Sequence, residues 1–161
     1  MATAIRNTDP VLKSVCDAHN SLKVQVGAGA KFHLDASERA VTAANASDLA
    51  TSLTLVNQIL DVYQFHMADT LAHKVAGVAL ASYAKATSLA TAITRANDIK
   101  SKFNTHRAST TYHYNADGGT VAAADATDQS SLNTLLNEIK GDLNTHLADG
   151  PSAPSLRLVG A

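Results

Sequence analysis

The sequence contains few of the residues that commonly stabilise a small protein. Its 161 residues include one cysteine, Cys16, no tryptophan, and an aromatic fraction of 4%. A single cysteine excludes an internal disulfide framework. No run of about 18 apolar residues is present, which argues against a transmembrane helix. The hydrophobic fraction is still 45%, so the chain should fold, but much of that fraction is alanine and the expected core is thin.

An excess of charge of either sign is also missing. The chain carries 13 basic and 14 acidic residues, for a net charge of -1. We therefore expect neither nucleic acid nor a membrane as a partner. The first residues, MATAIRNTDPVLKSV, lack the basic and apolar segments of a secretory signal. We expect the protein to be made and assembled in a cytoplasm.

What the sequence does contain is a repeat, which the histidines mark. Six of the seven histidines fall into two columns with a spacing of 40 residues. The columns are His33, His73, His113 and His66, His106, His146. Cutting the chain at the first column gives three gapless units, 33–72, 73–112 and 113–152. We predict a repeat domain over 33–150, preceded by residues 1–32, which contain a short helix and a glycine-containing loop. An extended C-terminal arm, 151–161, follows it.

The second half of each unit has helical periodicity. Apolar residues recur there at steps of three and four. We predict helices over 46–68, 86–108 and 126–148, and a shorter leading helix over 9–20. Asn45 and Asp125 are the expected N-caps, with Ser82 or Thr87 in the middle unit. The predicted fold class is all-α, a bundle or short solenoid. Connectors of about 16 residues permit parallel helices if they are extended and antiparallel helices if they are helical.

The histidine columns allow two interpretations. The first is a metal site formed by His66, His73, His106 and His113. Seven residues of helical spacer would, however, place the two imidazoles of a unit about two turns apart, too far to share one ion. The second is structural, with His66, His106 and His146 bonding backbone carbonyls at the turn after each helix. We favour this second reading and predict no bound cofactor.

Three asparagines occupy one column in the middle of the predicted helices: Asn57, Asn97 and Asn137. Asparagine is a mediocre helix former, so its recurrence indicates a specific role. We predict that each side-chain amide bonds the backbone of a neighbouring connector and fixes its register.

The sequence has no pattern typical of an enzyme. Gly118-Gly119 does not open a phosphate-binding loop, and no nucleophile elbow is present. The most distinctive residues are copied three times, whereas catalytic sites are usually singular. We therefore predict a protein that is not an enzyme. The C-terminal arm carries Leu156, Leu158 and Val159, which we predict to contact a neighbouring subunit.

Two segments carry a family resemblance. AADATDQSSLNTLLNEIKGDLNTHLA, residues 123–148, and AANASDLATSLTLVNQILDVYQFHMA, residues 43–68, resemble tandem repeats of virion structural proteins from tailed bacteriophages. The closing PSLRLVGA is similar to tails of the same proteins. The middle unit departs from the pattern at ASYAKATS, where Lys85 replaces an acidic residue.

The resemblance implies a structural component of the virion. We expect a capsid decoration or cement protein whose partners are other virion proteins, either the major capsid or the connector and tail proteins, and copies of itself. A neck, collar or tail accessory protein is the alternative in the same class. The alternative in another class is a histidine-rich metal-binding helical protein, and a soluble adaptor whose repeats bind peptides is a third.

Overall fold

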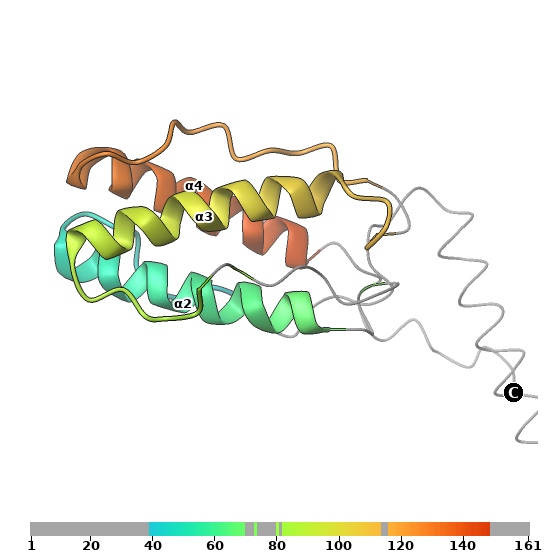
Figure 1. The fold of residues 1–161 in the computed structure, drawn as a ribbon, viewed down its shortest axis with the longest axis horizontal. Helices are drawn as coiled ribbons and strands as arrows, with labels where there is room; N and C mark the ends of the chain where they lie inside the picture. The colour runs from blue at the N-terminus through green and yellow to red at the C-terminus, as the bar shows by residue number, and fades with distance from the viewer. Residues whose placement is uncertain (1–38, 70–72, 74–79, 81, 114–115, 149–161) are drawn as a thin grey trace, which may run out of the picture.

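The computed structural model describes residues 39–69, 73, 80, 82–113 and 116–148. Within these residues it contains three helices and no strand: α2 (Leu49–Ala68), α3 (Leu89–Ala108) and α4 (Gln129–Leu147) (Figure 1). The all-α prediction is therefore confirmed. The predicted leading helix at 9–20 and the C-terminal arm, with Leu156, Leu158 and Val159, lie outside the described residues.

Each helix begins three residues later than predicted. The N-caps are Asp48, Ser88 and Asp128, so the predicted caps at Asn45, Asp125 and Ser82 or Thr87 are wrong. In each case a hydroxyl residue three positions after the cap completes a capping box. In the first helix, the carboxylate of Asp48 accepts from the Thr51 N–H at 2.8 Å while the Asp48 N–H donates to the Thr51 hydroxyl at 3.0 Å. This reciprocal pair satisfies two amides and fixes the start of the helix.

The three helices run in the same direction (Figure 1). At their N-terminal ends, the Ser52 hydroxyl of α2 donates to the Asn133 side chain of α4 at 2.7 Å. At their C-terminal ends, the imidazoles of His66 and His106 meet at 3.1 Å. Each connector must therefore travel back along the bundle, which settles the question of helix direction that the sequence left open.

The asparagine column holds the connectors against the helices. Asn57 of α2 accepts from the Ala86 N–H at 2.8 Å and donates to its carbonyl at 3.0 Å. Asn97 of α3 makes the same pair of bonds with Ala126, at 2.8 and 3.1 Å. Asn137 of α4 makes it with Ala46, at 2.7 and 3.1 Å. Each helix thus binds the segment that leads into the next one, and the last binds the segment that leads into the first.

The core lies along the common axis of the helices, each of which packs on the other two. α2 and α4 contribute mainly leucine and isoleucine, including the fully buried Leu60 and Leu136. α3 contributes Ala92 and Ala96 in its first half, so its side of the core is thin there. Tyr63 and Phe103 fill the other half and meet edge to face at 5.9 Å between ring centroids.

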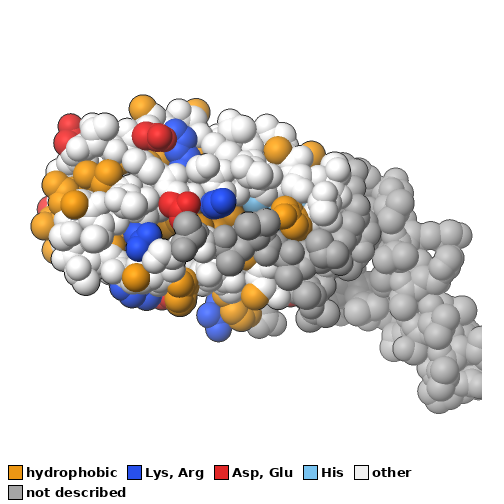
Figure 2. Space-filling model, viewed as in Figure 1, with side chains coloured by type: hydrophobic (Ala, Val, Ile, Leu, Met, Phe, Trp, Pro, Cys, Tyr) orange, Lys and Arg blue, Asp and Glu red, His pale blue; other side chains and the backbone are white. Residues whose placement is uncertain are grey.

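The surface of the described residues is mixed in character. Figure 2 shows basic, acidic and apolar side chains interspersed over one face, with a very small area of histidine. The large apolar side chains exposed in this part of the chain are Leu49, Phe65 and Tyr83. None of the helices in it is long and apolar enough to cross a membrane.

Candidate metal centre

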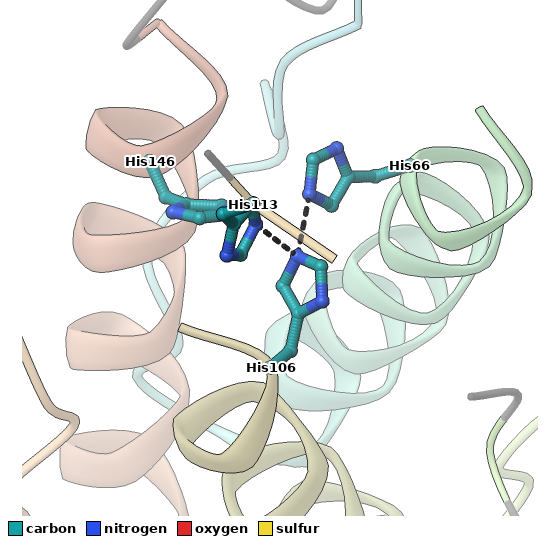
Figure 3. A group of neighbouring side chains, drawn as sticks. All are labelled: His66, His106, His113 and His146. Atoms are coloured by element: carbon teal, nitrogen blue, oxygen red, sulfur yellow. Dashed lines mark hydrogen bonds between the residues drawn. The ribbon is translucent and has the colours of Figure 1, made fainter. Parts of the chain in front are cut away.

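The C-terminal ends of the three helices bring together one complete histidine column. His66, His106 and His146 lie in the last turn of α2, α3 and α4. Their side chains point toward the bundle axis and toward one another (Figure 3), and their ring centroids are 5.1 to 5.3 Å apart. All three residues are at most 1% exposed. Because the helices are parallel and start in equivalent places, equal spacing along the chain becomes proximity in space.

Two members of the other column join this group from the connectors. His73 and His113 lie beyond the ends of α2 and α3, and they are 1% and 0% exposed. The ring of His73 lies 4.4 Å from that of His66, and the ring of His113 lies 4.2 Å from that of His106. The predicted separation of two turns assumed a helical spacer, whereas α2 ends at Ala68 and α3 at Ala108. His33, the third member of this column, lies outside the described residues.

The Nε2 atoms of four of these imidazoles form a chain of close contacts. Nε2 of His106 lies 3.1 Å from Nε2 of His66 and 2.9 Å from Nε2 of His113 (Figure 3). Nε2 of His66 also lies 3.1 Å from Nε2 of His73. One ligand nitrogen from each of His66, His106, His113 and His146 falls within 4.8 Å of the others. Four buried imidazoles from three helices and a connector can therefore surround a single point.

A carboxylate orients the fourth imidazole of this set. Nδ1 of His146 lies 3.0 Å from Oδ2 of Asp117, in the connector before α4. Asp117 also accepts from the Arg107 side chain at 2.5 and 3.1 Å, and from the Gly119 N–H at 2.8 Å. A carboxylate on one ring nitrogen is the usual partner of a histidine that binds metal through the other.

Arg107 and Asp117 form an ion pair inside the protein, where both side chains are 7% exposed. Arg107 also contacts the partly exposed carboxylate of Asp142 at 3.3 Å. Gly119 makes room for this arginine, because a Cβ added at Gly119 would overlap Nη2 of Arg107. The backbone closes the same loop, with the Asp117 N–H donating to the Arg107 carbonyl at 2.8 Å.

The titration of these groups follows from their surroundings. Burial alone would raise the pKa of Asp117, but hydrogen bonds from His146, Arg107 and Gly119 outweigh it and hold that pKa well below the ordinary value. Burial lowers the pKa of His113 to about 4, and neighbouring His146 and His73 add to the effect. Burial also lowers the pKa of His73. At neutral pH the carboxylate is therefore charged and these two imidazoles are neutral, which is the form that binds metal.

The structure brings together all four histidines that sequence analysis named as metal candidates, and it adds His146. That residue was assigned only to a turn, because no histidine follows it seven positions later. The backbone bonding at the turns was predicted for His66, His106 and His146, and it stays a prediction. A contact of that kind is made by His73, whose Nδ1 lies 2.9 Å from the Asp69 carbonyl.

Sequence reasoning missed Asp117 and Arg107. Neither belongs to a repeated column, since Met67 and Leu147 occupy the positions equivalent to Arg107. The signal available in the sequence was that these two positions depart from the repeat, and that signal is weak.

Comparisons with protein-family models, with curated proteins and with solved structures found no match to this chain.

Proposed function

We propose that this chain is a structural component of a tailed-bacteriophage virion and not an enzyme. Within that class we assign it to the proteins that decorate or cement the capsid shell. The assignment to phage particles rests on the sequence resemblance of residues 43–68 and 123–148. The proposed architecture is three tandem 40-residue repeats, with a leading helix before them and a C-terminal arm after them.

The ring of asparagine contacts carries the structural part of this proposal. Asn57, Asn97 and Asn137 are repeated polar residues in the helix interiors, and each binds the backbone of a connector of this same chain. Two further side chains act alike: Asn104 binds Val121, and Asn144 binds Val41, each through a pair of hydrogen bonds. A chain whose repeated asparagines bind its own connectors fits a structural building block better than an enzyme.

The mechanism would be adhesion. The arm at 151–161 would supply Leu156, Leu158 and Val159 to a neighbouring subunit. The partners would be the major capsid protein or the connector and tail proteins, together with further copies of this chain. Burial of apolar surface between subunits stabilises the assembled state by mass action. Assembly would take place in the host cytoplasm and the mature location would be the virion.

The test is to ask whether the protein sediments with assembled particles, and where it lies on them. Full-length chain and a variant ending at Gly150 would be mixed with particles that lack this protein. We expect the full chain to bind and the truncated chain to bind weakly, with equal helix content by circular dichroism. Failure of the full chain to bind any particle preparation would overturn the proposal.

Position on the particle separates the two virion assignments. Density repeated over the shell supports decoration. Density confined to the portal or tail supports the neck, collar or tail alternative and excludes decoration.

A second candidate function has an observation of its own. The five buried imidazoles at the C-terminal ends of the helices favour a metal-binding role. That role is compatible with a structural protein, because an ion bound there would join the three helices.

A further inference from the structure

We propose that His66, His106, His113 and His146 bind one divalent transition-metal ion. The ion would be structural, and it would join the C-terminal ends of α2, α3 and α4 to the connector that follows α3. This inference stands apart from the virion assignment, because it depends only on the arrangement of the imidazoles.

The contacts between the imidazole nitrogens exceed what hydrogen bonding allows. A ring nitrogen carries either one hydrogen or one lone pair, so it makes one good hydrogen bond in the plane of the ring. Nε2 of His106 nevertheless has two nitrogen neighbours, His66 and His113, at 3.1 and 2.9 Å. Nε2 of His66 likewise has two, His106 and His73, both at 3.1 Å. A chain of such contacts cannot be satisfied by protons alone, whereas one cation accepts all the lone pairs at once.

The spacing of the imidazole nitrogens also fits a bound ion. With metal–nitrogen bonds of about 2.05 Å, two ligand nitrogens stand about 3.3 Å apart at a tetrahedral angle and about 2.9 Å apart at a right angle. The separations of 3.1 Å between His66 and His106 and 2.9 Å between His106 and His113 fall within or close to this range. These pairs of nitrogens are therefore spaced as two ligands of one ion would be.

The outer ring nitrogen of one ligand is engaged in the way metal ligands require. Asp117 lies 3.0 Å from Nδ1 of His146. An acceptor at Nδ1 holds the proton there and leaves the lone pair on Nε2. In His146, Nε2 is therefore the coordinating atom.

The ligand chemistry restricts the ion. Neutral imidazole suits Zn²⁺, Ni²⁺, Co²⁺, Fe²⁺ and Cu²⁺, whereas Mg²⁺ and Ca²⁺ require oxygen ligands and Cu⁺ prefers sulfur. The ligands are at most 1% exposed, so the site resembles closed structural centres rather than catalytic ones with an open position.

The experiment uses the full chain without a histidine tag, purified and then dialysed separately against Ni²⁺, Co²⁺, Fe²⁺ and Zn²⁺. Elemental analysis should give one ion per chain after removal of excess metal. The Co²⁺ form should show visible absorption bands that the metal-free chain lacks. A metal content at background level with all four ions would refute the proposed metal site.

Variants separate ligation from folding. We expect His106→Ala, and independently His113→Gln, to lower metal affinity by at least about 100-fold. His113 lies in a connector, so its substitution leaves all three helix sequences intact. Asn144→Ala is the matched control, because it removes two hydrogen bonds to Val41 near the same end of α4 without removing an imidazole. Unchanged metal content in both histidine variants would overturn the proposal, as would equal loss in the Asn144→Ala control at a temperature where it is folded.

Discussion

The carboxylate of Asp117 lies 3.0 Å from Nδ1 of His146, although the two residues are 29 positions apart in the chain. The same carboxylate pairs with Arg107. One side chain in a connector thus ties the end of α3 to the end of α4, and it orients an imidazole of the candidate metal centre.

The first prediction follows from this contact. Asp117→Asn should reduce the free energy of unfolding by about 3 kcal/mol, because it leaves the Arg107 charge buried without its carboxylate. Asp142→Asn is the control, since that partly exposed carboxylate makes only a 3.3 Å contact with Arg107, and it should change stability by less than about 1 kcal/mol. Urea denaturation measures both, and equal effects would refute the special role of Asp117. In metal titrations, Asp117→Asn should also weaken binding about 10- to 100-fold.

Gly118 and Gly119 are adjacent but differ in the space around them, so substitutions at the two positions can be compared. A methyl group at Gly119 would overlap the Arg107 guanidinium, whereas one at Gly118 would meet nothing within 4 Å. Gly119→Ala should therefore destabilise the protein by about 1–3 kcal/mol, since the guanidinium would have to shift and disturb its buried ion pair with Asp117. Gly118→Ala should be neutral or slightly stabilising, because alanine restricts the unfolded chain. Thermal melts of the two variants, side by side, test the placement of Arg107.

The asparagine column predicts that substitutions at its three positions lower stability by similar amounts. Asn57→Ala, Asn97→Ala and Asn137→Ala each remove two hydrogen bonds to a connector backbone, so each should cost about 1–3 kcal/mol. Thr54→Ala removes only a bond to the carbonyl one turn earlier and should cost much less. Three similar losses are expected from a closed bundle. A loss at only one of the three positions would show that the contacts are not equivalent.

The helix caps predict a contribution to the free energy of unfolding that is lost in acid. Hydrogen bonds from Thr51 and Ser131 lower the pKa of the exposed caps Asp48 and Asp128 below the ordinary value. A depressed pKa in the folded state gives stability that is present above the ordinary pKa of aspartate and disappears as the pH falls through the lower value. A variant carrying Asp48→Ser and Asp128→Ser should therefore lose less stability between pH 5 and pH 2 than the natural chain. Ser88 already caps α3 without a charge, so serine is a suitable replacement. Parallel stability–pH curves for the two proteins would contradict this.

The sequence predicts some features of this protein accurately and others poorly. The apolar stripes ending near His66, His106 and His146 predict three helices and their C-terminal ends well, because the 3.6-residue period is strong there. The helix starts were misplaced by three residues because Asn45 and Asp48 are both good caps. Only the hydroxyl of Thr51, which completes the capping box with Asp48, decides between them.

The site was harder to foresee than the helices. The spacing of 40 residues identifies the histidine columns, but proximity requires parallel helices, and the connectors alone permit either direction. His73 meets His66 only because α2 stops at Ala68, and local propensity does not reveal where a connector turns inward. Asp117 is a single carboxylate among many, and only its position beside His146 distinguishes it.

The last prediction concerns removal of the metal. If one ion joins the ends of the three helices, a strong chelator should lower the melting temperature of the natural chain, and added Ni²⁺ or Co²⁺ should restore it. The gain should rise with the logarithm of free metal concentration, because the ion binds the folded state in preference to the unfolded one. Differential scanning calorimetry of the untagged chain measures this dependence. His66→Ala should have a melting temperature that does not respond to metal, whereas Asn57→Ala, which lies two and a half turns away on the same helix, should respond like the natural chain. A natural chain whose melting temperature is the same with chelator and with saturating metal would contradict a structural role for the ion.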